Sequence, residues 1–79
     1  MTLEQMTDLK RLHLVTTNSL TFTFNDGTFE VGYFTSQEEP VNAENKWRIV
    51  TNNDSVKYRE TQSNDYTKII DGNKVIEVL

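Results

Sequence analysis

The chain has 79 residues and a formal net charge of −4, from 8 basic and 12 acidic side chains. It contains no cysteine, which excludes a disulfide framework, a thiolate metal site and a cysteine nucleophile. The excess of carboxylates argues against a strongly basic nucleic-acid surface, and no apolar run approaches the roughly 18 residues that a membrane span requires. We therefore expect one small cytoplasmic domain over residues 1–79, with neither a signal peptide nor a membrane segment.

The first predicted element is a short amphipathic helix from Thr2 to about Arg11. Thr2 and Gln5 have the spacing of a capping box, in which each side chain bonds the backbone N–H of the other residue. Apolar residues recur at intervals of three and predict one stripe that docks on a sheet: Leu3, Met6, Leu9 and Leu12.

Two strands joined by a tight turn follow the helix. Apolar and polar residues alternate over Leu20–Phe24, and the next residues include Asp26-Gly27, a dipeptide typical of hairpin turns. The second strand is predicted from Thr28 to about Thr35. Gly32 inside it indicates a bulge or a close approach of another backbone.

The second half of the chain predicts further short strands after a surface loop over Ser36 to Asn45, in which Glu38 and Glu39 are solvated. Asn52–Asp54 is either a turn or a bend within one long strand, and a true turn would raise the strand count from five to six. The predicted segments are a strand over Lys46–Val50, a resumed alternation at Val56, Tyr58 and Glu60, a strand over Tyr66–Ile70, a tight turn at Asp71-Gly72-Asn73 and a strand over Lys74–Val78. This succession favours a mainly β fold, a small five-stranded antiparallel barrel with an N-terminal helix.

The motifs in this order resemble the Sm and Sm-like proteins, a family of small β-barrels. The resemblance rests on the alternating strand, the Asp-Gly turn, Gly32, the segment Val56–Glu60, and a second motif over Ile69–Val78 in which Gly72, Val75 and Val78 have the family's spacing. It implies an SH3-like/Sm-like barrel and a homo-oligomer, with rings closed by edge strands. Asp71 departs from the family, which carries a basic residue before the glycine of the second motif.

The resemblance also supplies an alternative function, RNA binding, with Trp47 stacking a base and Asn45 bonding one. Lys46 and Arg48 alternate along one predicted strand, as do Lys57 and Arg59 along another, so each pair would share a strand face and offer cations to phosphates. The candidate RNA-binding residues are Asn45, Lys46, Trp47, Arg48, Lys57, Arg59, Asp71 and Gly72.

The interpretation that the sequence favours is a non-enzymatic, homo-oligomeric Sm-like interaction module that binds protein partners. Its aromatic side chains exceed what one thin barrel can bury, so some of Phe34, Trp47, Tyr58 and Tyr66 should reach the surface, where aromatics mark protein interfaces. Neither a catalytic constellation nor a metal-ligand spacing is present in the sequence, and we expect no cofactor. The last strand carries apolar residues on both faces and predicts an oligomer interface at Val75, Ile76, Val78 and Leu79.

Overall fold

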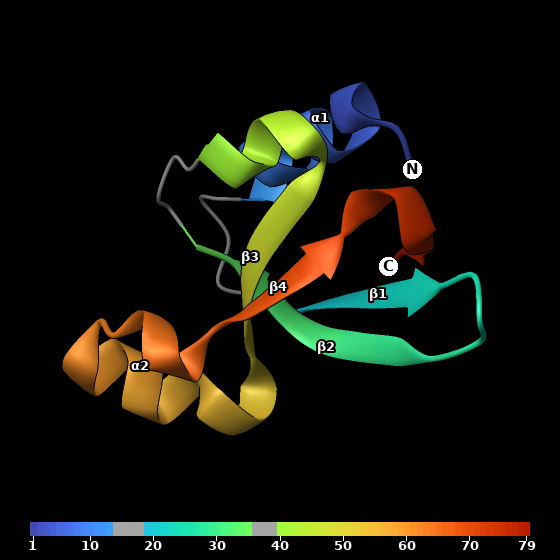
Figure 1. Ribbon diagram of the computed structural model, residues 1–79. Coiled ribbons are helices and arrows are strands. Elements are labelled where there is room, and N and C mark those ends of the chain that lie inside the picture. Colours follow the sequence, from blue (N-terminus) through green and yellow to red (C-terminus); the bar gives the residue numbers. More distant parts are fainter. Residues whose placement is uncertain (14–18, 36–39) are drawn as a thin grey trace.

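Five antiparallel strands form one sheet in the computed structural model, which describes residues 1–13, 19–35 and 40–79 (Figure 1). The strand order is β4-β3-β2-β1-β5, so the last strand pairs with the first, and β4 and β5 are the two edges. The ladders among the described residues do not close the sheet. The predicted short N-terminal helix and five-stranded antiparallel sheet are confirmed. The strands are β1 (Leu20–Phe24), β2 (Phe29–Phe34), β3 (Lys46–Thr51), β4 (Lys68–Asp71) and β5 (Val75–Val78).

Helix α1 (Leu3–His13) begins with the predicted capping box. The backbone N–H of Thr2 donates to Gln5 Oε1 at 2.9 Å, and that of Gln5 donates to Thr2 Oγ1 at 3.1 Å. The predicted apolar stripe is only partly correct, because Met6 is buried and Leu9 half-buried, whereas Leu3 and Leu12 are exposed. A spacing of three drifts by about 60° per step around a helix of 3.6 residues per turn, so the ends of such a row leave the buried face.

The core lies between the inner face of the sheet and α1. Phe22 and Phe34 pack edge to face with ring centroids 5.3 Å apart, and Phe34 meets Trp47 in the same way at 6.1 Å. The expectation that some of the four aromatics reach the surface holds only for Tyr66, which is half-buried, because Phe34, Trp47 and Tyr58 are buried. The buried cluster consists of Met6, Leu20, Phe22, Phe34, Trp47, Ile49, Ile70 and Val75.

The segment after β3 is helical, and the predicted continuation of a strand through Val56, Tyr58 and Glu60 is wrong. Thr51 ends the strand, a 3₁₀ turn η2 (Asn52–Asp54) follows, and α2 (Ser55–Thr61) comes next. Only Tyr58 of this helix is buried. In so short a segment, alternation with one buried side chain fits a helix as well as a strand. Asn52–Asp54 is thus a turn, and the strand count stays at five because a helix follows it in place of a sixth strand.

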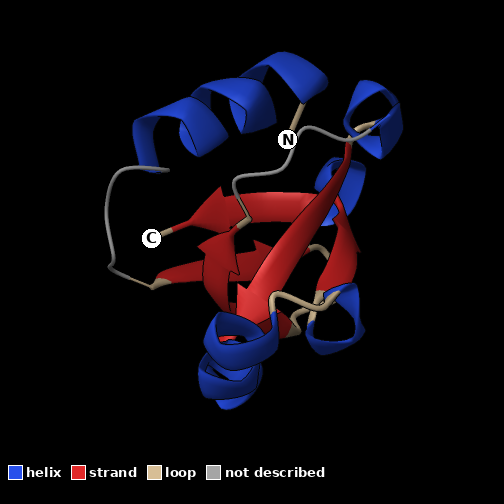
Figure 2. Cartoon of the chain, turned by 90° about the vertical axis from the view of Figure 1, so that its left-hand side faces the viewer, coloured by secondary structure: helices blue, strands red, loops and turns tan. Residues whose placement is uncertain are grey.

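The helices and the 3₁₀ turns lie around the sheet. Figures 1 and 2 show α1 and α2 at opposite ends of it. The predicted loop over 36–45 includes a 3₁₀ turn, η1 (Pro40–Glu44), while its residues Ser36, Glu38 and Glu39 lie outside the described ranges. Another 3₁₀ turn, η3 (Asn64–Tyr66), delays β4 to Lys68. Among the described residues, no helix has the length and apolar character needed to cross a membrane.

Gly32 marks a close backbone approach, as its position in a strand indicates. A Cβ atom at this residue would lie 2.1 Å from the carbonyl oxygen of Val50 on β3, far inside van der Waals contact. Because the neighbour is backbone within a paired strand, it cannot rotate away as a side chain could.

Substitution of Gly32 by alanine should therefore lower the free energy of unfolding by about 2 kcal/mol or more, through overpacking between β2 and β3. This change in the free energy of unfolding is measured by urea titration, with Trp47 fluorescence as the signal. Glu60→Ala, on the exposed side of α2, is the control and should change stability by at most about 0.5 kcal/mol. Equal midpoints for the two variants would contradict the close approach.

Candidate functional site

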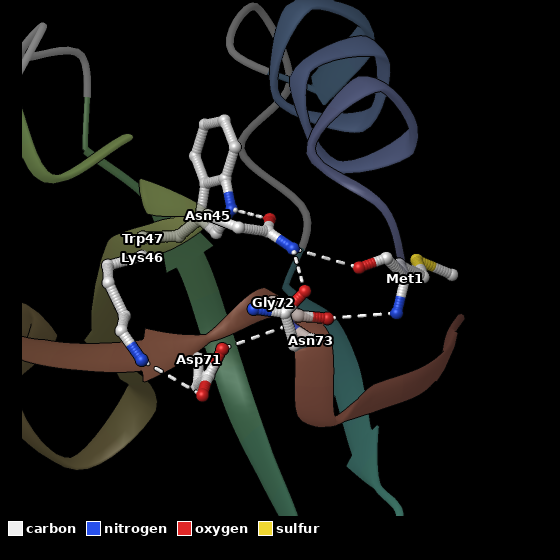
Figure 3. Close-up of polar contacts among 7 residues, drawn as sticks. All are labelled: Met1, Asn45, Lys46, Trp47, Asp71, Gly72 and Asn73. Atoms are coloured by element: carbon white, nitrogen blue, oxygen red, sulfur yellow. Dashed lines mark hydrogen bonds and ion pairs between the residues drawn. The ribbon is translucent and has the colours of Figure 1, made fainter. Parts of the chain in front are cut away.

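The chain changes direction between β4 and β5 at a 3₁₀ turn, η4 (Gly72–Lys74), which we call the β4–β5 corner. Asp71 caps the turn, because its Oδ1 accepts from the backbone N–H of Asn73 at 3.0 Å. The backbone N–H of Gly72 donates to the carbonyl oxygen of Asn45 at 2.7 Å. The residue just before β3 is thereby joined to the turn that sends β5 towards β1 (Figure 3).

Asn45 is the residue on which these contacts converge. It is buried, and its backbone adopts a left-handed conformation with φ of 60°, which asparagine tolerates better than most residues. Its Nδ2 donates to the carbonyl oxygen of Met1 at 2.9 Å and to Asn73 Oδ1 at 3.0 Å, while its Oδ1 accepts from Trp47 Nε1 at 2.8 Å (Figure 3). One amide side chain therefore connects the start of the chain, the corner and the core indole.

Gly72 is required by this arrangement. A Cβ atom on Gly72 would lie 2.2 Å from Asn45 Oδ1, so any side chain would displace the amide. The carbonyl of the same residue accepts from the α-ammonium of Met1 at 2.8 Å, and the carbonyl of Val75 accepts from it too. The glycine that carries the family resemblance thus has a packing role in this chain.

The charged pair at the corner is Lys46 and Asp71, cross-strand neighbours on β3 and β4 with Nζ and Oδ2 2.9 Å apart. The Lys46 ammonium lowers the pKa of the Asp71 carboxyl below its ordinary value, and the backbone N–H of Asn73 adds to the effect. The carboxylate at the position where the family carries a cation is thus held in its charged form by a neighbouring cation.

The structure separates the candidate RNA-binding residues into two groups. Asn45, Lys46, Asp71 and Gly72 meet at the corner. Trp47 is only 2% exposed and lies in the core beside the ammonium of Lys10, so the expectation that it stacks at the surface is wrong.

The remaining cations lie elsewhere. Arg48 donates to Thr67 Oγ1 at 2.6 Å. Lys57 and Arg59 are on α2, where two residues apart means about 200° around the axis, so the shared strand face expected for them is wrong. Lys57 Nζ lies 5.7 Å from the ring centroid of Tyr66, and Arg59 Nε donates to the carbonyl of Ser55.

Of the residues predicted to form the oligomer interface, two contribute to the core and two are exposed. Val75 is buried in the core and Val78 packs against it half-buried, whereas Ile76 is 62% and Leu79 76% exposed. Ile76 and Leu79 are thus the two exposed members of the predicted interface. Sequence reasoning missed Met1 and Asn73, which bond Asn45 from distant positions, because no local spacing signals such contacts.

Comparison with known proteins leaves the chain without an assigned relative: no family model, no curated protein and no solved structure matches it. The described residues contain no group of three or more histidine, cysteine or carboxylate side chains placed to hold a metal ion. The site must therefore be interpreted from its own geometry, which is a polar corner between two edge strands.

Replacement of Asn45 by alanine should lower the free energy of unfolding by about 2–4 kcal/mol, because the Trp47 indole N–H and the Met1 carbonyl lose their partner. Urea titration followed by Trp47 emission measures the change. Asn52→Ala is the matched control, since it removes another asparagine that accepts one hydrogen bond, from Ser19, at the surface. If the two variants unfold at the same urea concentration, Asn45 does not hold the corner.

The lowered pKa of Asp71 predicts a pH dependence of stability. The folded carboxyl releases its proton at lower pH than the unfolded one, whose ordinary value is 3.8. Its stabilising contribution is therefore complete above that value and is lost as the pH falls through the folded pKa. Asp71→Asn should lower the urea midpoint at pH 7, and this difference should shrink as the pH falls below 3.8.

Lys46→Met is the partner variant, and in its background the effect of Asp71→Asn should shrink. An Asp71→Asn effect that is independent of pH would contradict the ion pair.

Proposed function

We propose that the chain is a non-enzymatic, homo-oligomeric interaction module of the SH3-like/Sm-like barrel type, which assembles through its two edge strands and presents the assembly to protein partners. The observation that carries the proposal is the complementarity of those edges. β4 and β5 lie at opposite ends of the strand order, so each leaves one side without a strand partner among the described residues. Such edges readily accept another strand.

The two edges match in charge and in burial when β4 of one copy is aligned antiparallel to β5 of the next. Exposed Ile69 stands opposite exposed Ile76, while buried Ile70 stands opposite buried Val75. At the ends of the alignment, Lys68 faces Glu77, and Asp71 faces Lys74, the residue of η4 that precedes β5. Cross-strand pairs of opposite charge and of apolar side chains each stabilise a ladder. Lys68 also pairs with Glu30, and Asp71 with Lys46, within the chain, so the two charged contacts would add to existing ion pairs.

The contact is heterologous, since it uses a different edge on each copy. A heterologous contact repeats until the rotation between copies closes a ring. The resemblance to the Sm-like family supports a ring for the same reason. The closed assembly would leave neither edge open, which removes the hazard of uncontrolled strand addition.

The corner favours protein partners over RNA. The net charge is −4, Asp71 places a carboxylate at the corner, and the side-chain groups of Asn45 already bond protein atoms. Phosphate attraction, which dominates nucleic-acid affinity, has little support in such a surface. RNA binding by the candidate residues other than the buried Trp47 stays a prediction, tested by titration with a U-rich or A-rich oligonucleotide at low salt.

Light scattering of four proteins tests the assembly: the unmodified chain, Ile69→Asp, Ile76→Asp and the control Phe29→Asp. Phe29 is 64% exposed, as Ile76 is at 62%, but it lies on the inner strand β2. We expect the unmodified chain and Phe29→Asp to form the same multimer and the two edge variants to be monomeric, because each places an uncompensated charge in the ladder.

Mixing the two edge variants identifies the contact. Ile69→Asp keeps a competent β5 and Ile76→Asp keeps a competent β4, so the mixture should form a one-to-one dimer and go no further. A single-chain mass for the unmodified protein at all concentrations would overturn the proposal. A multimer that both edge variants preserve would overturn this interface.

A further inference from the structure

Within one chain, β4 and β5, which form one segment with the corner, could also pair with each other as a hairpin. Gly72-Asn73 is a dipeptide that suits a two-residue hairpin turn, with glycine at the first central position. A hairpin around it would place Asp71 opposite Lys74, Ile69 opposite Ile76 and Lys68 opposite Glu77. These are the pairs that support contact between copies, now formed in one copy.

The structure does not use this hairpin. The corner bends the chain as a 3₁₀ turn, and β5 pairs with β1 instead, with Phe22 opposite Val78 and Thr23 opposite Glu77. Each arrangement gives β5 one neighbouring strand, but the hairpin would leave β1 without its partner on that side. Buried Ile70 and Val75 would also share a face in the hairpin, so the burial pattern of the segment suits both arrangements.

The groups that select the corner lie outside the segment. Asn45 donates to Asn73 Oδ1 and accepts at its backbone carbonyl from Gly72, and the Met1 α-ammonium donates to the carbonyls of Gly72 and Val75. Within the segment, the cap from Asp71 to the backbone of Asn73 supports the bend locally. Loss of the Asn45 contacts would therefore remove hydrogen bonds that stabilise the bend from outside the segment. The pairs that would form in the hairpin would be unaffected.

We infer that the β4–β5 corner is a switch between an assembling state and a self-capped state, and that Asn45 is the positioning residue that holds the assembling state. In the corner, β4 and β5 are two separate open edges. In the hairpin, the same residues pair in one chain, so both complementary edges are consumed and contact between copies is blocked. This inference rests on the proposed function, because the hairpin would inhibit the assembly that forms through the same two edges.

Disulfide trapping tests the inference in a chain that has no native cysteine. In the double variant Ile69→Cys/Ile76→Cys, the hairpin yields an internal disulfide, and contact between copies yields cross-linked multimers, which are separated by mass after mild oxidation. Adding Asn45→Ala should raise the ratio of internal to intermolecular disulfide by about tenfold, the factor that corresponds to about 1.4 kcal/mol for one lost hydrogen bond. Asn52→Ala in the same background is the control and should leave the ratio unchanged.

Two further variants distinguish hairpin formation from unfolding as the source of internal disulfides. Ile69→Cys/Leu79→Cys places both cysteines at exposed positions outside the hairpin register, so an unfolded chain would cross-link this pair about as readily as the first, and a hairpin would not. Asn73→Ser removes only the acceptor of Asn45 Nδ2, at an exposed site, and keeps a residue suited to a Gly-X turn. It should raise the ratio in the same direction as Asn45→Ala.

The outcomes separate the two proposals. A ratio that neither Asn45→Ala nor Asn73→Ser raises overturns the switch, even when multimers form. Internal disulfides that appear equally in the two cysteine pairs overturn it as well. The absence of intermolecular disulfide, together with a monomeric unmodified chain, overturns the assembly instead.

Discussion

The hydrogen bonds of one buried amide determine how this sheet is completed. Asn45 connects the first residue of the chain, the indole of Trp47 and the turn between β4 and β5. A buried amide of this kind is costly unless its donors and acceptor are partnered, and here each has at least one partner. The turn therefore has a specified direction, and β5 crosses to β1 because the residue before β3 holds the turn in place.

The local elements of the fold were predictable because each has a short-range cause. The capping box at Thr2, the alternation over Leu20–Phe24 and the turn at Asp26-Gly27 depend on neighbours a few residues away. Gly32 likewise indicated the backbone approach that the structure contains. In contrast, Ser55–Thr61 is helical although its alternation favours a strand, because one buried tyrosine in seven residues satisfies both periods.

The candidate site was predictable only in part, in its membership as well as in its roles. Four of the eight candidate RNA-binding residues meet at the corner of the folded chain: Asn45, Lys46, Asp71 and Gly72. Their contacts depend on Met1 and Asn73, at separations of 44 and 28 residues from Asn45, which no local spacing encodes. The burial of Trp47 was not predictable for a similar reason. An aromatic residue on a strand has the same sequence pattern whether a helix packs over it or it is exposed to solvent.

These contacts also explain why the edges matter. A sheet whose first and last strands pair usually approaches closure, and a strand order with β4 and β5 at its ends leaves two edges that fit one another in charge and burial. The same side chains could pair between copies or within one chain. In the proposed switch, the corner decides which pairing forms, so that Asn45, which lies outside both edge strands, would govern what these edges can contact.

The strand partner of β5 in the unmodified chain, at a concentration where it is a single copy, tests this account most directly. Nuclear Overhauser contacts in solution distinguish the two possibilities. The account predicts contacts between Phe22 and Val78 and between Thr23 and Glu77, with slow exchange of the Leu79 amide that donates to Thr21. Contacts between Ile69 and Ile76 in place of these would contradict it, because β5 would then be folded onto β4 despite an intact Asn45.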